Sequence, residues 1–339
     1  MNILSLFDGM SCGQIAINRL GIKYDNYFAS EIDKYAIQVT KANYPDTKHI
    51  GSVVDVKGEN LPKIDLLIGG SPCQSFSFVG KKNGMSTSCS QEILTLEHYL
   101  ELKADGFEFD GQSYLFWEYM RLLKETKPKY FLLENVLMGH RWQKILSKTI
   151  GIDPIKINSS LLSGQSRNRL YWTNIGTTNN NLFGIEQVGI NQPQDKGILL
   201  RDILQQNVSD KYFINQLNKN YSFKPMRLKK KFTQLDSKDK SLCLCHANSL
   251  SNWIGDFVSE SFVSSSKKIY AGNDDYENYA DLDIFKDVRI RRLTPIECER
   301  LQTVPDNYTN HVSDVQRYRM LGNGWTVDVI AYILKHMEL

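Results

Sequence analysis

The sequence has few cysteines, and they follow no regular spacing. Six cysteines occur in 339 residues, without the spacing of a disulfide framework. The N-terminus carries Asp8 where a secretory signal peptide needs its apolar stretch. No apolar run approaches the roughly 18 to 20 residues that span a bilayer. These absences argue against secreted and membrane-spanning classes, so we expect a cytoplasmic protein with no membrane partner.

The sequence also lacks a strong excess of either charge. Its formal net charge of +3 permits an anionic partner without demanding one, so nucleic-acid binding would have to come from local basic stretches. The strongest stretch is Arg227 with Lys229, Lys230 and Lys231, for which phosphate contact and a solvated face are equal alternatives. Cys243-Leu244-Cys245-His246 lacks a second ligand pair, so we expect no metal and assign it to a strand.

Short β-rich runs alternate with helical patterns from Met1 to about Gly176. The candidate strands are residues 3–7, 27–30, 64–68, 130–133, 155–159 and 170–174. This alternation predicts an α/β fold with a doubly wound, mostly parallel sheet. Leu115, Tyr119 and Leu122 fall at helical spacing, which predicts an amphipathic helix that ends before Pro128.

The composition changes after Gly176. The chain becomes rich in Asn, Gln, Ser and Lys with little periodicity, up to an acidic stretch at residues 274–287. We interpret this region as a smaller, loop-rich domain. A regular pattern resumes with Thr294-Pro295, which opens a helix, and a Gly-Asn-Gly turn at residues 322–324 precedes a final apolar helix.

Two chemically active side chains follow two of the predicted strands. Cys73 comes after Gly69-Gly70-Ser71-Pro72, directly behind the apolar run 64–68, and Glu134 follows residues 130–133. Carboxyl ends of parallel strands meet at one edge of a sheet, where open α/β sheets bind ligands. A thiol beside a carboxyl group suggests covalent catalysis, whereas an isolated cysteine is more often packed and inert.

A glycine turn after the first strand suggests a ligand-binding loop. The turn at residues 7–13 leads into a helix that begins near Gln14, a shape that lets backbone approach a ligand closely. Gly9 and Gly13 do not fit the G-x-G-x-x-G spacing of dinucleotide-binding loops. By itself, therefore, this turn could equally be an ordinary strand-to-helix connection.

Two acids at the ends of the next strands make the case for a cofactor. Glu31 can accept hydrogen bonds from both ribose hydroxyls, and Asp55, which follows residues 49–54, could accept from an adenine amino group. Each acid alone is more often a helix cap. Together with the glycine turn they outline an adenosine pocket without a phosphate cradle, which favours S-adenosylmethionine over NAD or ATP.

At these positions the sequence resembles the DNA (cytosine-5)-methyltransferases. The similarity covers, in order, the 7–13 turn, Glu31, Asp55, Ser71-Pro72-Cys73-Gln74, Glu134-Asn135-Val136, Gln165-Ser166-Arg167-Asn168-Arg169, the segment 291–298 and Gly322-Asn323-Gly324-Trp325-Thr326-Val327. The stretch of about residues 177–287 matches no shared motif, as the family's variable target-recognition region would. The resemblance implies the S-adenosylmethionine-dependent methyltransferase fold, a catalytic domain at residues 1–176, a target-recognition domain at 177–317 and a C-terminal segment at 318–339 that returns to the catalytic domain.

The resemblance also implies a mechanism. Cytosine C5 is a poor nucleophile, so the Cys73 thiolate would add to C6 and make C5 enamine-like. Glu134 would bind the N3 and amino edge of the base, Arg169 would hold O2, and Arg167 would support the same site. Loss of the C5 proton and elimination of Cys73 would then release 5-methylcytosine.

The implied cofactor contacts come from several turns. Phe7 and Ile32 would flank the adenine, and Asn323 and Thr326 would approach the methionine end, with Gly9, Gly13 and Pro72 completing the cofactor site. Because the target atom is inaccessible inside a duplex, the base must be flipped out, with residues 74–90 closing over it. Lys81 and Lys82 in that segment would suit backbone phosphates, and a surface loop is the alternative.

Departures from the family pattern are few. Ser11-Cys12-Gly13 is less glycine-rich than in many members, and Gly324-Trp325 replaces a serine and an aliphatic residue, so Trp325 could reshape the cofactor pocket. The transfer-RNA-methylating branch usually has a second proline before the cysteine, and Ser71 here favours DNA. A non-catalytic DNA-binding relative would tolerate the loss of catalytic side chains that are all present.

We therefore expect an active prokaryotic or phage-type enzyme. Its expected partner is double-stranded DNA, and a monomer without metal is expected. Whether a restriction endonuclease acts on the same site, and which DNA sequence is recognised, are left open at this point.

Overall fold

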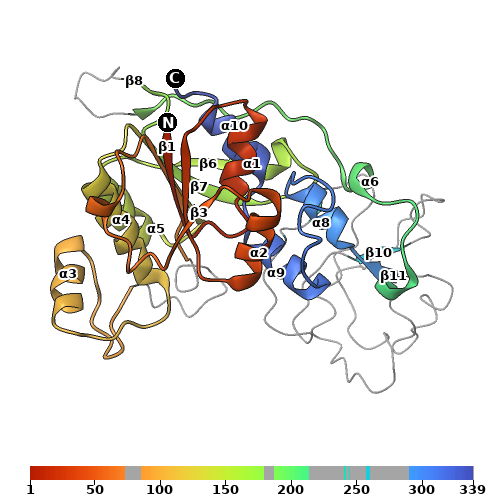
Figure 1. The fold of residues 1–339 in the computed structure, drawn as a ribbon. Coiled ribbons are helices and arrows are strands. Elements are labelled where there is room, and N and C mark those ends of the chain that lie inside the picture. The colour runs from red at the N-terminus through yellow and green to blue at the C-terminus, as the bar shows by residue number, and fades with distance from the viewer. Residues whose placement is uncertain are drawn as a thin grey trace, which may run out of the picture. The chain divides into compact units, whose positions relative to one another are not determined.

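A computed structural model of the chain describes residues 1–72, 85–178, 187–213, 240–241, 244, 257–259 and 290–338 (Figure 1). The chain divides into two compact units. The first unit comprises Met1–Asn158, Asn168–Pro193 and Gly324–Leu339, and the second comprises Ser159–Arg167 and Gln194–Asn323. No helix of the described ranges is both long and apolar enough to cross a membrane.

A seven-stranded sheet forms the centre of the first unit. Its order is β3 (Lys48–Gly51), β2 (Asn26–Ser30), β1 (Asn2–Leu6), β4 (Leu66–Gly70), β5 (Tyr130–Val136), β7 (Asn168–Thr173) and β6 (Ile155–Asn158). The first five strands are parallel, and β7 is antiparallel to both of its neighbours. The predicted doubly wound, mostly parallel sheet is therefore confirmed.

The strand order reverses between β1 and β4. The chain builds β1, β2 and β3 in one direction and then returns to place β4 on the other side of β1. Helices that follow strands on either side of such a point diverge, and the carboxyl ends of the strands there form a ligand-binding crevice. The turns after β1 and β4 are therefore the positions at which a site is expected.

Helices cover both faces of this sheet. The bounds are α1 (Cys12–Arg19), α2 (Lys34–Asn43), α3 (Leu96–Ala104), α4 (Phe116–Thr126), α5 (His140–Ile150) and α10 (Val327–Leu334). In Figure 1, α1 and α10 lie together on one side of the sheet, and α4 and α5 lie on the other. Because successive strand residues point to opposite faces, Leu4, Leu6 and Leu67 join Trp117 and Trp142 in one core.

The close approach of α1 to the sheet depends on Gly13. A Cβ atom at this position would lie 2.3 Å from Ile68 Cδ1 and 3.0 Å from the Tyr27 hydroxyl. A larger residue would therefore push the helix away from the strands. The glycine that was predicted as part of a ligand turn thus has a packing role as well.

Most predicted elements are present. All six candidate strands occur, and α4 ends at Thr126 before Lys127, which has a left-handed φ of 42°. Strand β3 (Lys48–Gly51) ends earlier than the expected run of residues 49–54. Gly51, with φ of 79°, turns the chain there. Asp55 consequently lies in a loop rather than directly behind the strand, and the apolar residues of that loop, Val53 and Val56, are buried.

Smaller elements complete the described chain. In the first unit they are the antiparallel strands β8 (Thr177–Thr178) and β9 (Gln187–Val188). In the second unit they are the antiparallel strands β10 (Phe257–Ser259) and β11 (Ile290–Arg292). The helices of the second unit are α6 (Leu200–Ile203), α8 (Pro295–Leu301) and α9 (Asp314–Asn323). The predicted start of α8 is confirmed, because Thr294 and Glu297 form a reciprocal capping box around Pro295.

Two fully buried carboxylates of α8 organise the second unit. Glu297 pairs with the Arg291 guanidinium at 2.7 and 2.8 Å. Glu299 accepts hydrogen bonds from the backbone of Asn307 at 2.7 Å and Thr309 at 2.9 Å, and from Arg317 Nη2 at 2.9 Å. Buried charges are stable only when they are paired in this way.

We predict that Glu299→Ala lowers the free energy of unfolding by about 3–5 kcal/mol, because it removes the closer carboxylate partner of the buried Arg317, leaving Asp314 at 3.7 Å, and the acceptor of two backbone N–H groups. Urea denaturation of the purified variant measures the loss. The control is Arg201→Ala, which removes an exposed pair with Asp202 at 3.6 Å and should cost below about 1 kcal/mol. Equal losses for the two variants would contradict the assigned role of Glu299.

Candidate active site

The turn after β1 has an unusual backbone. Phe7, Gly9 and Ser11 all have positive φ angles, of 57°, 58° and 60°. A Cβ atom added to Gly9 would meet nothing within 4 Å, so the space beside this turn is open. Phe7 is half-buried at the edge of the core. The turn therefore combines open space beside Gly9 with a half-buried aromatic ring at Phe7.

The buried side chain of Asp8 holds this turn by hydrogen bonds. Its carboxyl group is buried and accepts hydrogen bonds from the hydroxyls of Tyr27, at 2.8 Å, and Ser11. Burial raises the pKa of Asp8 from 3.8 to about 6, and the hydrogen bonds only partly oppose that effect. The turn is thus built on a carboxyl group that changes its charge near neutral pH.

Glu31 connects the end of β2 to the same turn. One carboxylate oxygen accepts from the backbone N–H of Gly9 at 2.8 Å, and the other accepts from Ile32 at 2.7 Å and Asp33 at 2.8 Å. The cap of α2 is Asp33, which accepts from the backbone of Tyr35. The capping alternative for Glu31 is therefore wrong, and its carboxylate is held at the edge of the sheet instead.

Ile32 is exposed beside this carboxylate. Although it is apolar, 70% of its surface is accessible. An exposed branched side chain next to a fixed carboxylate offers a ligand both an apolar contact and a hydrogen-bond acceptor. This combination suits a flat ring attached to a sugar.

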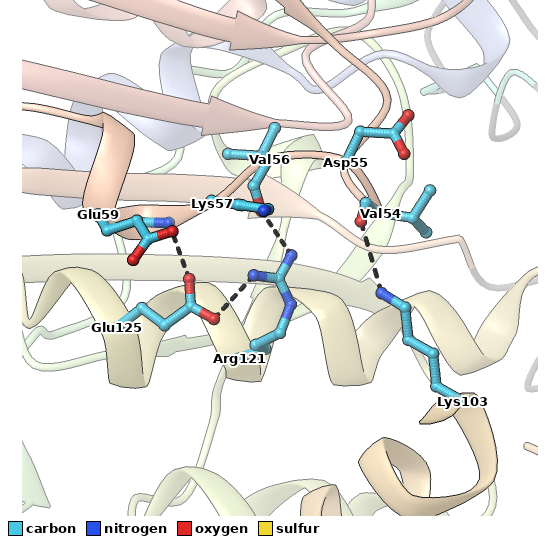
Figure 2. A pocket seen from close by; sticks show the side chains of 9 residues that line it. Val54, Asp55, Val56, Lys57, Glu59, Lys103, Arg121 and Glu125 are labelled. Atoms are coloured by element: carbon cyan, nitrogen blue, oxygen red, sulfur yellow. Dashed lines mark hydrogen bonds and ion pairs between the residues drawn. The ribbon is translucent and has the colours of Figure 1, made fainter. Parts of the chain in front are cut away.

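Asp55 is exposed and lines a cavity of about 760 Å³ behind the β3 loop (Figure 2). The lining residues are Val54, Asp55, Val56, Lys57, Gly58, Glu59, Lys103, Arg121 and Glu125. Glu134 is not among them, so this cavity is separate from the carboxyl group expected to act on a substrate base. Its charged side chains serve mainly to hold the loop.

Arg121 is the main support of that loop. Figure 2 shows Arg121 of α4 and Lys103 of α3 both reaching the loop backbone. Arg121 Nη2 donates to the carbonyls of Val53 at 3.1 Å and Val56 at 2.8 Å, and Lys103 Nζ lies 3.4 Å from the Val54 carbonyl. The position of Asp55 therefore depends on a helix that is distant in sequence.

Glu118 holds both cations in place. Its carboxylate is fully buried and accepts from Arg121 Nε at 2.7 Å, Lys103 Nζ at 2.5 Å and the Tyr99 hydroxyl at 2.5 Å. With four charged or polar groups satisfied together, the cluster can remain buried. A single ionic cluster thus links α3, α4 and the loop after β3.

The carboxyl group of Glu134 lies at the end of β5, opposite Gly70 of β4. It is 91% buried and has donors on both oxygens. Arg169 Nε lies 2.9 Å from Oε1, and Trp325 Nε1 donates to Oε2 at 3.2 Å. Glu134 and Arg169, which were expected to contact the same base, thus form an ion pair with each other in the structure.

Asn135 joins the ends of β4 and β5. Its amide nitrogen donates to the Ser71 carbonyl at 3.2 Å and to the Ser71 hydroxyl at 3.0 Å. Pro72 follows at once, and it is the last described residue of this segment. The chain is therefore fixed immediately before Cys73, at the strand next to Glu134.

Other predicted site residues lie near the ends of α9 and α10. Arg167, in the second unit, is buried and donates to the carbonyls of Leu244 at 2.8 Å and Gly322 at 3.1 Å. Asn323 is exposed at the end of α9, whereas Thr326 is buried at the start of α10 in the first unit. The roles expected for these three residues stay predictions.

Several expectations fall outside the described residues. They concern Cys73 itself, the part of the closing segment at 74–84 with Lys81 and Lys82, the basic cluster at Arg227 and Lys229–Lys231, and Cys243, Cys245 and His246.

Two contacts of the site were not predicted, that of Arg121 with the loop after β3 and that of Trp325 with Glu134. Arg121 had no sequence signal, because one arginine on an amphipathic helix resembles any solvated charge. Trp325 did have a signal, since it departs from the family pattern, but nothing in the sequence connected it with Glu134.

Comparison with solved structures supports the fold assignment. The Entamoeba histolytica methyltransferase EhMeth matches with a TM-score of 0.68 at 17% identity, covering 99% of this chain and 97% of that one. The Dnmt2 methyltransferase of S. pombe matches with a TM-score of 0.64 at 16% identity and the same coverage. At these identities the likeness shows the fold, which is that of the S-adenosylmethionine-dependent methyltransferases.

Sequence comparison then gives the family. The profile of C-5 cytosine-specific DNA methylases matches residues 1–101 and 103–339, so the chain belongs to this family and is a cytosine-C5 DNA methyltransferase. The type II methyltransferase M1.ScrFI of Lactococcus lactis subsp. cremoris is 27% identical over 347 residues, covering 99% of this chain and 77% of that protein. The orphan methyltransferase M.SPBetaI of Bacillus phage SPbeta is 24% identical over 431 residues, covering 99% and 97%. The resemblance noted in the sequence is confirmed.

The raised pKa of Asp8 predicts a pH-dependent stability. Between the unfolded pKa of 3.8 and the folded value of about 6, the folded state binds more protons, so the free energy of unfolding falls as pH rises. The expected fall from this group is about 3 kcal/mol between pH 3.5 and pH 7. Urea denaturation across this range should show that the fall is absent from Asp8→Asn. Parallel pH profiles for the variant and the parent would contradict the assignment.

Proposed function

We propose that the protein transfers a methyl group from S-adenosylmethionine to C5 of a cytosine flipped out of double-stranded DNA, with Cys73 as the nucleophile. The observation that carries this proposal is the buried Glu134 carboxylate, which Arg169 holds at the end of β5 beside the Ser71-Pro72 turn of β4. A base in front of Glu134 would be within reach of the residue that follows Pro72. Because β4 and β5 are neighbouring strands, an acid from one and a nucleophile from the other could act on the same cytosine ring.

The residues at the ends of β1 and β2 fit S-adenosylmethionine. Gly9 leaves open space beside the turn, and Ile32 offers an exposed apolar contact for adenine opposite Phe7. A carboxylate has about four lone-pair sites, so Glu31 can accept from ribose hydroxyls in addition to its three backbone donors. Asp55 would receive the adenine amino group.

The methionine end of the cofactor would lie toward Pro72, Thr326 and Asn323, with Gly13 packed behind the turn. Bound there, the cofactor would supply an electrophilic methyl group. We assign no metal to the reaction, because each step is an addition, a methyl transfer or a proton transfer that thiol, carboxyl and guanidinium groups can serve.

The protein's own groups would act on the cytosine ring. The Cys73 thiolate adds to C6, and the electrons of the C5–C6 bond move toward N3 and O2, where Glu134 shares a proton and Arg169 stabilises negative charge. C5 is then enamine-like and accepts the methyl group. A base removes the C5 proton, the C5–C6 double bond re-forms, and Cys73 leaves as a thiolate.

We further propose double-stranded DNA as the partner and about residues 177–287 as the region that reads its sequence. M1.ScrFI is named as a type II methyltransferase. On this basis we propose a companion restriction endonuclease as a further partner of this chain. A cytoplasmic location is proposed with it, since genomic DNA would be the substrate. Ser71, in place of a second proline, supports DNA over transfer RNA.

The first test maps 5-methylcytosine at base resolution after incubating unmethylated genomic DNA with the protein and S-adenosylmethionine. We predict methylation at one short motif, its abolition by Cys73→Ser, and a fall of about 10²- to 10⁴-fold in kcat/KM for Glu134→Gln. The matched control for Glu134→Gln is Glu97→Gln, which changes an exposed carboxylate of α3 that pairs with Lys124 and should retain full activity. Methylation by Cys73→Ser at the parent rate would refute the mechanism, and methylation of transfer RNA alone would change the substrate.

A second test concerns the support of the Asp55 loop. Arg121→Lys keeps the charge next to Glu118 but loses the planar fork that reaches two carbonyls. Because a typical hydrogen bond contributes about 0.5–1.5 kcal/mol, we expect the Kd for S-adenosylmethionine to rise roughly 3- to 10-fold by calorimetry. Lys124→Gln, on the same helix with an exposed Glu97 pair, is the control. An unchanged Kd in both variants would show that the loop does not contribute to cofactor binding.

A further inference from the structure

Trp325 lies next to Glu134, the carboxylate proposed to recognise cytosine. The sequence motif that contains Trp325 does not explain this position. Gly322 and Asn323, which were predicted to form a turn, are the last residues of α9, so Trp325 lies in the short segment between α9 and α10. Many family members have a serine and then an aliphatic residue at positions 324 and 325. In the structure its side chain is half-buried, and its indole N–H donates to Glu134 Oε2 at 3.2 Å. The departure from the family pattern is therefore also a direct contact with a proposed catalytic residue.

Two glycines make room for this indole. A Cβ atom on Gly70 would lie 2.8 Å from Trp325 Nε1 and 3.1 Å from Glu134 Oε2, so only glycine admits the contact. A Cβ atom on Gly13 would lie 3.5 Å from Trp325 Cζ3. The indole thus extends from the first turn of α1 to the end of β5, across the point where the strand order reverses.

The Glu134 carboxylate is oriented by donors on both of its oxygens. Arg169 Nε lies at Oε1 and Trp325 Nε1 at Oε2, so the plane of the carboxylate is set from two sides. Each oxygen keeps lone-pair capacity for a base. With Arg169 alone, the carboxylate could rotate about its last torsion, since terminal sp³–sp² torsions are broad.

The chemistry of the donor suits this position. An indole N–H donates a hydrogen bond and cannot accept one, and the aliphatic residue common at this position in the family does neither. Trp325 therefore cannot compete for the proton that Glu134 would share with N3 of cytosine. Its aromatic ring also excludes water from the Gly70 side of the carboxylate, which strengthens the remaining hydrogen bonds.

We propose that Trp325 is a positioning residue for base activation, acting by holding Glu134 in the orientation that meets the N3 edge of the flipped cytosine. This inference rests on the proposed role of Glu134. It assigns the indole N–H to the cytosine step of the reaction rather than to the binding of the cofactor.

The test is Trp325→Phe, which keeps an aromatic ring and removes the donor. Single-turnover methylation of a duplex carrying the mapped motif should slow by about 10- to 100-fold, as for the loss of a hydrogen bond to a charged group. The Kd for S-adenosylmethionine should stay within about 2-fold of the parent value. Trp325→Leu, with an aliphatic residue of the kind many family members carry, should slow methylation similarly and provides a second variant if the first folds poorly.

A control separates this effect from a general loss of tryptophan. Trp172→Phe removes another indole donor, which bonds Ser147 Oγ at 3.0 Å within the core, and should lower the melting temperature without changing the methylation rate. A double-mutant cycle provides the decisive comparison. In a Glu134→Ala background, Trp325→Phe should cause no further loss of rate.

Each other outcome overturns the inference. A parent rate for Trp325→Phe would show that the indole contact has no catalytic role, and a loss that persists in Glu134→Ala would show that Trp325 acts through another group. Weaker cofactor binding at an unchanged rate would place Trp325 in the cofactor site instead. If the parent protein methylates no DNA, the proposed function fails first and this inference fails with it, whereas an active parent with an unaffected variant refutes only the inference.

Discussion

The pairing of β4 with β5 is the constraint on which the candidate site depends. This parallel pairing places Gly70 opposite Glu134, so the turn that leads to Cys73 starts beside the carboxylate that would bind the base. Asn135 reinforces the arrangement through its hydrogen bonds to Ser71. A shift of one residue would turn Glu134 to the other face of the sheet, because side chains alternate along a strand.

Carboxylates that accept several hydrogen bonds hold three loops of the described chain. Glu118 fixes the Arg121 and Lys103 side chains that hold the Asp55 loop, Glu31 fixes the turn after β1, and Glu299 contacts the segment after α8. For the buried Glu118 and Glu299 these hydrogen bonds compensate the cost of removing the charge from water. The positions of the Gly9 turn and the Asp55 loop thus depend on side chains that are distant in sequence.

Much of this could be read from the sequence, for identifiable reasons. Apolar runs bounded by glycine and polar residues indicated the strands, and the residues just behind them, Glu31 and Glu134, could be placed at one edge because parallel strands share it. The predicted end of β3 was too late in the sequence. Val53 and Val56 are apolar and buried like strand residues, but they belong to the loop that follows β3. The contacts of Arg121 with the Asp55 loop and of Trp325 with Glu134 were not predicted, because these partners lie far apart along the chain.

The sequence by itself determined the family, the order of the elements and the chemical types of the groups at the strand ends, because these follow from local pattern and motif spacing. Tertiary structure alone decided that Glu31 holds the turn after β1 through Gly9, and that an indole completes the surroundings of Glu134. The indole contact depends on how closely the backbones of α1, β4 and β5 approach one another. That approach is set by glycines whose missing side chains matter only once the elements are packed together.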